Sequence, residues 1–302
     1  MNGTLNNKNP LSRIIASLIL LCPLISFPAA SECQPGRVNE GNDQWIEPSI
    51  DALKSLGFTC LDEKLDRVSS RRCVGRIPGY SGKVALYIPL HFDPEKNPPS
   101  LITHFHGHVV ENDSFEETLN RYHLGTELHH SGRNSLLVVP ESRGKCDTYR
   151  EELSSANALQ SLHANVVSIL KKSGFFAESL APESITHEIS GHSGAYWPIG
   201  NILRESLDRS PPFRVGLFDA TYCSNTGEEN PRLKTGATAC RGIHEYAKKH
   251  PGSLKSYFLE NSPTAKGSKL LIPLADRIGL SRNRFNHFTV MNENYSSWIR
   301  QE

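Results

Sequence analysis

The stretch that decides the fold reads Ser184-Ile-Thr-His-Glu-Ile-Ser-Gly-His-Ser-Gly-Ala-Tyr196. Its first half predicts a short strand that ends at Ile189, and a helical pattern begins at Ala195. The turn between them carries the G-x-S-x-G pattern with alanine in the last place. Such a turn needs small residues, because it holds its serine in a strained backbone conformation that lifts the hydroxyl above the sheet. We therefore predict that Ser193 is a nucleophile, against the alternative of an ordinary glycine-rich loop.

Strands and helices alternate on both sides of this turn. Seven short segments are rich in apolar or β-branched residues, which predicts strands over Arg72–Ile77, Lys83–Ile88, Leu101–Phe105, Ser135–Val139, Ser184–Ile189, Phe213–Phe218 and Leu254–Leu259. Apolar residues at helical spacing predict helices over Glu151–Lys172, Ala195–Leu207, Arg241–His250 and Lys269–Arg277. An opening hairpin followed by this alternation predicts the α/β class, with a mostly parallel sheet and helices on both faces.

The composition is that of a globular chain. It has 302 residues, 37% of them hydrophobic, and 33 Lys and Arg balance 32 Asp and Glu. These values exclude a mostly disordered chain. They also provide no strongly basic field, so nucleic acid is not an expected partner.

The N-terminus predicts a secretory signal peptide over residues 1–30. A basic start without acids leads into the apolar run Ile14–Phe27, and small residues follow around Ala30. The run is shorter than the roughly 20 residues that a membrane-spanning helix needs, so we expect no stable membrane insertion. We expect export to the periplasm or the extracellular medium, a polar lead-in over residues 31–69, and one catalytic domain over residues 70–302.

The cysteines agree with export. Seven are present, and removal of the signal peptide takes away Cys22. Six remain, namely Cys33, Cys60, Cys73, Cys146, Cys223 and Cys240. An even count in an exported chain predicts up to three disulfides. The preferred pairing is Cys223–Cys240, and the second is Cys60–Cys73.

A second segment, Leu101-Ile-Thr-His-Phe-His-Gly-His108, is a strand that runs into a His-Gly-His turn. Acyl transfer needs backbone N–H groups where negative charge develops on the substrate oxygen. We expect one donor from Gly194, directly after the predicted nucleophile. The other is expected from Gly107 or His108.

A base and an acid complete the expected constellation. His287 lies late in the chain, where a histidine suits the general base that takes the proton from Ser193. Asp219 and Glu260 each follow a predicted strand, and either acid could orient the imidazole. We favour Asp219, because small residues surround it, and keep Glu260 as the alternative.

The hairpin, His106-Gly107, the turn at Ser193 and the order serine, acid, histidine together resemble the α/β-hydrolase superfamily, over roughly residues 70–300. More narrowly, the sequence is similar to a group of bacterial α/β-hydrolase-like proteins that carry Asp-Ala-Leu-Tyr after the sixth strand, which also favours Asp219. The resemblance implies an exported serine hydrolase that cleaves an ester, or less readily an amide, through an acyl-enzyme. It implies a small-molecule or acylated substrate and no cofactor. The departures are Ala195 and the lack of a clear last strand before His287.

Two other functions fit parts of the sequence. His104, His106 and His108 alternate along a strand, as in some zinc sites, which would suit a metal-dependent hydrolase. The same fold could also serve as a non-catalytic binding module.

The segment between Phe105 and Ser135 is the expected pocket-shaping insertion, and it contains Tyr122, His123, His129 and His130.

Overall fold

The computed structural model describes residues 43–65, 67–94, 99–109, 113–122, 124–144, 146–221, 234–259 and 276–280. The chain divides into two compact units, Met1–Arg37 and Val38–Glu302, and every described residue belongs to the second. Some expectations therefore concern residues outside the described ones, and these stay predictions. They are the signal peptide with Cys22, and Cys33, His123, Cys223, Glu260 and His287.

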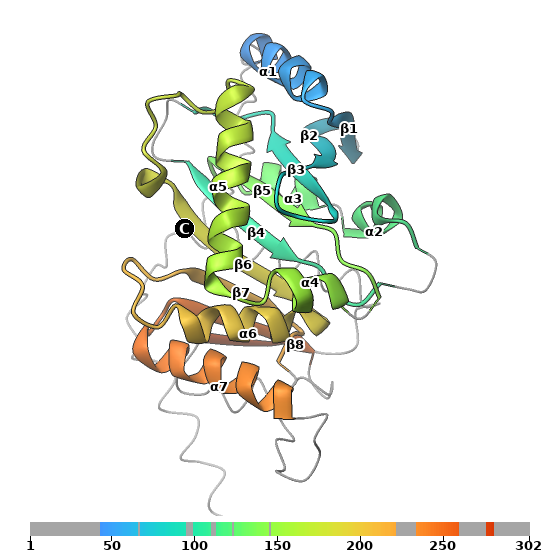
Figure 1. Cartoon of the computed structure of the whole chain (residues 1–302). Helices are drawn as coiled ribbons and strands as arrows, with labels where there is room; N and C mark the ends of the chain where they lie inside the picture. The colour runs from blue at the N-terminus through green and yellow to red at the C-terminus, as the bar shows by residue number, and fades with distance from the viewer. Residues whose placement is uncertain are drawn as a thin grey trace, which may run out of the picture. The chain divides into compact units, whose positions relative to one another are not determined.

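One mixed sheet runs through the described residues, in the strand order β1-β2-β3-β5-β4-β6-β7-β8-β9 (Figure 1). The strands are β1 (Thr59–Leu65), β2 (Arg67–Arg76), β3 (Lys83–Pro89), β4 (Ser100–Phe105), β5 (Ser135–Pro140), β6 (Thr186–His192), β7 (Arg214–Phe218), β8 (Leu254–Leu259) and β9 (Asp276–Leu280). Strand β2 is antiparallel to β1 and β3, and β3 is antiparallel to β5. The remaining pairs, from β5–β4 to β8–β9, are parallel. The predicted hairpin and mostly parallel α/β sheet are confirmed.

Helices cover both faces of the sheet. They are α1 (Asp43–Ser55), α2 (Phe115–Tyr122), α3 (Leu124–His130), α4 (Asp147–Glu152), α5 (Ala156–Lys172), α6 (Tyr196–Glu205) and α7 (Lys234–Lys249). Figure 1 shows α5, α6 and α7 over one face, where they share the larger buried core with α1 and α4. Helices α2 and α3 lie on the other face, where Leu119 and Leu128 pack in a second buried cluster with Tyr87 of β3. The sheet is therefore packed on both sides.

The long helix α5 illustrates how the sequence encodes these layers. The Ser155 side chain accepts a hydrogen bond from the Ala158 N–H and caps the first turn. Leu159, Leu162 and Val166 recur on one side, and all three are buried in the larger core. The last turn carries two lysines, whose positive charges interact favourably with the negative end of the helix dipole.

The seven predicted strands are present, but the structure corrects the edges of the assignment. Residues 31–69 are not merely a lead-in, because α1 and β1 belong to the same core and sheet as the rest of the domain. Residue 70, the expected start of the catalytic domain, lies inside β2. The helix predicted over Lys269–Arg277 is wrong at its end, because Asp276–Leu280 form strand β9. The sequence lacks a clear strand signal before His287, but strand β9 is present there.

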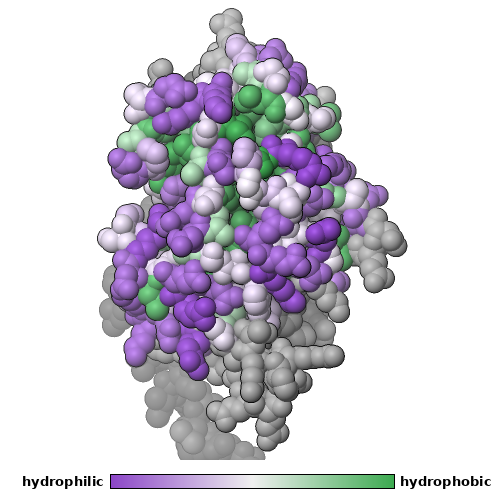
Figure 2. Space-filling model, in the orientation of Figure 1, coloured by the Kyte–Doolittle hydropathy of each residue, from purple (hydrophilic) through white to green (hydrophobic). Residues whose placement is uncertain are grey.

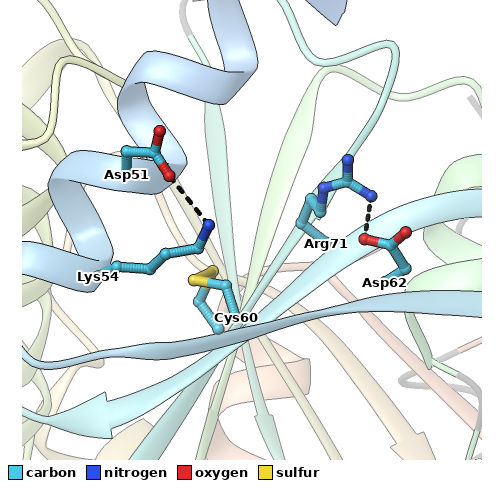
Figure 3. Close-up of a disulfide and its surroundings, with 6 residues drawn as sticks. Asp51, Lys54, Cys60, Asp62 and Arg71 are labelled. Atoms are coloured by element: carbon cyan, nitrogen blue, oxygen red, sulfur yellow. Dashed lines mark hydrogen bonds and ion pairs between the residues drawn. A yellow bond between two sulfur atoms is a disulfide. The ribbon is translucent and has the colours of Figure 1, made fainter.

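A disulfide joins Cys60 to Cys73, which face each other across the antiparallel pair β1–β2 with their Cα atoms 4.0 Å apart (Figure 3). The second-choice pairing is thus confirmed. Cys240 also takes part in a disulfide, whose other half lies outside the described residues, so its pairing with Cys223 stays a prediction. Among the described cysteines, Cys146 is a free, buried thiol and takes no part in the expected disulfides.

The face of the molecule drawn in Figure 2 is mostly polar. Figure 2 shows hydrophilic residues over most of the face in view, with hydrophobic ones gathered in its upper part, near α1. Leu56 and Leu61 are the large hydrophobic side chains that are exposed among the described residues. No helix within the described ranges is both long and apolar enough to cross a bilayer.

Candidate active site

The turn after β6 holds Ser193 in the strained conformation that the sequence pattern predicts. Its φ angle is 51°, in the left-handed region that non-glycine residues rarely adopt. Such a conformation costs about 1–3 kcal/mol and is concentrated at functional sites. Among the described residues, Cys146 and Asp219 are the other non-glycine residues with positive φ. Cys146, Ser193 and Asp219 follow the carboxyl ends of β5, β6 and β7, which belong to the parallel part of the sheet, so the strain gathers at one edge of it.

Close packing explains the small residues around Ser193. A Cβ atom on Gly191 would collide with the Cδ1 of Ile199 and would lie 2.8 Å from the Cβ of Ala195. The first glycine of the pattern is therefore required. Ala195 itself is fully buried, and its methyl group fits in the short 3₁₀ turn, Ser193–Ala195, that leads into α6. Alanine in the last place is a tolerated departure, because the turn has room for that methyl group.

The loop after β4 lies directly against this turn. A Cβ atom on Gly107 would lie 2.6 Å from the Nδ1 of His192 and 3.0 Å from the Cβ of Ser193. Only glycine lets the backbone come this close. The structure thus brings Gly107, Ser193 and Gly194 together, as the expected oxyanion site requires. His108, the other candidate on this loop, is exposed.

Asp219 follows β7 at the same edge of the sheet. Its φ angle is 47°, and its backbone N–H donates a 2.7 Å hydrogen bond to the carbonyl of Tyr257 on β8. Its side chain is half-buried. Strands β8 and β9 end at Leu259 and Leu280. In the sequence Glu260 follows Leu259 directly, and His287 comes seven residues after Leu280. The expected serine, acids and histidine therefore follow β6, β7, β8 and β9, which are adjacent and parallel.

Comparison with known proteins gives a match at the level of structure. No protein-family model matches the sequence, and no curated protein matches it significantly. An S-formylglutathione hydrolase from Agrobacterium tumefaciens aligns with a TM-score of 0.51 at 12% identity, over 80% of this chain and 99% of that one. The chain has the α/β-hydrolase fold.

A putative dipeptidyl aminopeptidase IV from Bacteroides ovatus also aligns, with a TM-score of 0.50 at 12% identity. That alignment covers 78% of this chain and 36% of the other protein. At these identities the likeness concerns the α/β-hydrolase fold alone. The chemistry of the site must therefore be inferred from the residues of this chain.

The three histidines of the β4 segment do not form a metal site. Burial lowers the pKa of His106 to about 4, so its ring is neutral at pH 7. The Ser142 N–H donates to its Nε2 at 3.0 Å, and its Nδ1 lies 2.9 Å from the Gly107 carbonyl oxygen. Both ring nitrogens are thus occupied. The Nδ1 of His104 lies 2.9 Å from the Ser190 hydroxyl, and within the described ranges no three His, Cys, Asp or Glu side chains are grouped so that they could hold a metal ion.

Helices α2 and α3 form the insertion that was expected to shape the pocket, and only part of it reaches the site. The Tyr122 ring lies edge-on to His192, at 6.1 Å between centroids. Burial raises the pKa of the Tyr122 phenol to about 12, so it stays protonated. His129 instead approaches His91, with 3.3 Å between their Nδ1 atoms, away from Ser193. Nothing is described of the side chain of His130.

Cys146 is the site residue that the sequence reasoning missed. Its Sγ lies 3.1 Å from where a Cβ on Gly194 would stand, and its S–H points to the His106 carbonyl oxygen at 3.7 Å. Burial raises the pKa of this thiol to about 12, so it is neither a thiolate nor a nucleophile. The cysteine count predicts a disulfide for this residue, and that prediction is wrong. No local sequence signal marks it, because its place depends on how three loops meet.

Proposed function

We propose that this protein is a serine hydrolase that cleaves carboxylic esters. The observation that carries the proposal is the positive φ of Ser193 in a turn against which the backbone of Gly107 packs. Backbone strain of this kind costs free energy, and it is concentrated at sites where it positions a side chain for a reaction. The S-formylglutathione hydrolase of the same fold supports a hydrolytic activity in general.

The proposed reaction begins when the Ser193 hydroxyl attacks the ester carbonyl and its proton passes to His287. The N–H of Gly194 and one N–H from Gly107 or His108 stabilise the negative oxygen of the tetrahedral intermediate. The bond to the alcohol then breaks as His287 returns the proton to the leaving oxygen. Water, activated by the same imidazole, releases the acid from the acyl-enzyme and restores the serine.

Asp219 is the proposed acid that holds the imidazole, and Glu260 is the alternative. The φ of 47° at Asp219 and its backbone bond to Tyr257 support a rigid loop after β7. Asp219 follows β7, the neighbour of β6, and Glu260 follows β8, one strand further from β6. Comparing Asp219→Asn with Glu260→Gln therefore decides between the two acids. Loss of activity in Glu260→Gln alone would assign the role to Glu260.

We also propose export through residues 1–30. The Cys60–Cys73 disulfide supports this, because disulfides persist in oxidising compartments. Mass spectrometry of the protein secreted or released from the periplasm tests it, since a mature N-terminus near Ser31 is expected. A chain retained in the cell with its first residues intact would contradict export.

The test of the activity is hydrolysis of p-nitrophenyl esters of increasing acyl length. Wild type is expected to be active, and Ser193→Ala is expected to lose at least a thousandfold in kcat. Ser173→Ala is the matched control, because it also removes a serine hydroxyl, one that is buried and donates to the Ile169 carbonyl at the end of α5. Equal activity in Ser193→Ala and Ser173→Ala would refute the proposal.

A further inference from the structure

The loop after β4 is tied to the loop after β5 by three interactions. The Ser142 N–H donates to the Nε2 of His106 at 3.0 Å, and the Val109 N–H donates to the Gly144 carbonyl at 3.1 Å. The Cys146 S–H points to the His106 carbonyl oxygen at 3.7 Å. Because the His106 ring is one of the partners, a side chain and not only the backbone connects the two loops.

These contacts determine which tautomer His106 adopts. Its Nε2 accepts the proton of the Ser142 N–H, so this nitrogen carries no hydrogen of its own. The neutral ring therefore carries its proton on Nδ1, which donates to the Gly107 carbonyl at 2.9 Å. The ring is fully buried, with the aromatic rings of Phe115 and Tyr149 centred 6.2 and 5.2 Å away. It has little freedom to turn.

The bond to the Gly107 carbonyl has a geometric consequence one residue further on. The Gly107 carbonyl and the His108 N–H belong to the same peptide group, which is trans. In a trans peptide the C=O and N–H bonds point in opposite directions. When His106 holds the carbonyl, it thereby sets the direction of the His108 N–H.

We propose that His106 is a positioning residue, which orients the Gly107–His108 peptide so that the His108 N–H serves as the second oxyanion donor. This inference rests on the proposed function. His106 does not touch the substrate. It acts through a peptide that Gly107 places against Ser193.

Two substitutions separate the two hydrogen bonds of the ring. Asparagine places an amide near the position of Nδ1, so His106→Asn keeps a donor for the Gly107 carbonyl. Glutamine reaches the position of Nε2, so His106→Gln keeps a partner for Ser142 but loses the bond to Gly107. His163→Gln is the matched control, because His163 is also a buried histidine, hydrogen-bonded at Nε2 to the Thr103 hydroxyl, but it lies on α5.

The experiment measures kcat and KM on p-nitrophenyl acetate together with the melting temperature of each variant. His106→Gln is expected to lose about 10- to 100-fold in kcat with KM changed less than about threefold, since a misdirected donor costs less than a deleted one. His106→Asn and His163→Gln are expected to stay within about threefold of wild type in kcat.

Equal kcat values for His106→Gln and His163→Gln would overturn the inference. A folded His106→Asn whose kcat falls by about 10-fold or more from wild type would overturn it too, and this measurement decides the question if His106→Gln does not fold. Wild type without any esterase activity would refute the proposed function, and the role of His106 with it. Active wild type with unaffected variants would refute the role of His106 alone.

Discussion

Replacing Gly107 by alanine tests the contact between the two loops of the site. The new Cβ would lie 2.6 Å from the Nδ1 of His192, 3.0 Å from the Cβ of Ser193 and 3.2 Å from the His192 carbonyl oxygen. Ordinary contacts begin near 3.4 Å, so the loop must retreat by several tenths of an ångström. His192 is buried in this turn and cannot easily move instead.

Two magnitudes follow from that retreat. Overpacking of this kind destabilises a fold by about 1–3 kcal/mol. Withdrawing one oxyanion donor lowers kcat by about 10²- to 10³-fold. We therefore expect Gly107→Ala to remain folded while kcat on p-nitrophenyl acetate falls by about two orders of magnitude, with a smaller change in KM.

Gly132→Ala is the matched control for this measurement. Gly132 has a φ of 68° and no atom within 4 Å of its virtual Cβ, so alanine there costs stability through backbone strain alone. It lies in the turn after α3, at the opposite end of β5 from Pro140. Urea unfolding gives the stability of each variant, and initial rates give kcat. A folded Gly107→Ala with the kcat of Gly132→Ala would refute the close packing of Gly107 against the site.

Three further predictions concern stability and the free thiol. Burial lowers the pKa of His187 to about 4, below the roughly 6.5 of an unfolded histidine, so the unfolded chain binds the extra proton first. The free energy of unfolding should then fall by up to about 3 kcal/mol as the pH drops from 6.5 towards 4. Urea titrations should show a smaller fall for His187→Gln than for wild type. Equal falls in the two proteins would contradict the role of His187. Glu188 is buried and ion-paired with Arg133 and Arg214, so Glu188→Gln should cost about 3–5 kcal/mol in urea unfolding, and a cost below about 1 kcal/mol would show that the pairs contribute little. Cys146 should resist N-ethylmaleimide in the native protein and react after denaturation, as peptide mapping can show; rapid native alkylation would contradict its burial.

The central strands and the turn at Ser193 could be predicted because local sequence and tertiary environment agree there. Segments such as Ser135–Pro140 are continuous apolar runs, and the structure buries every residue of this strand. The small residues around Ser193 express a steric requirement that exists in any strand-to-helix turn of this shape. Both signals are local, so they are legible in the sequence.

The elements that were missed lack such a signal. Strand β1, Thr59–Leu65, lies at the edge of the sheet and includes Asp62, Glu63 and Lys64, so its composition resembles a loop. Its neighbour β2 begins with a polar stretch before Arg72, and for the same reason the sequence predicts this strand only from Arg72 onwards. Strand β9, Asp276–Leu280, has only a short alternating pattern, and the helix predicted from the sequence overlaps its first two residues.

Within the site, the sequence could name residues but not the contacts that connect them. From the sequence, either Gly107 or His108 could supply the oxyanion donor. The hydrogen bond from His106 to the Gly107 carbonyl, which only the structure shows, is what distinguishes the two N–H groups. Cys146 was expected in a disulfide because counting cysteines ignores where they lie. Its free thiol beside Gly194 depends on contacts between residues almost 50 positions apart in the sequence.

The most direct test of Ser193 as the nucleophile is covalent labelling of the folded protein with a fluorophosphonate. Such probes react with a serine only when its hydroxyl is activated and the oxyanion is stabilised, so they report the whole proposed site at once. We expect one adduct per chain by intact mass, mapped by peptide sequencing to Ser193 and absent from Ser193→Ala. A folded wild-type chain that acquires no adduct, or acquires it on another residue, would contradict the claim that Ser193 is the nucleophile.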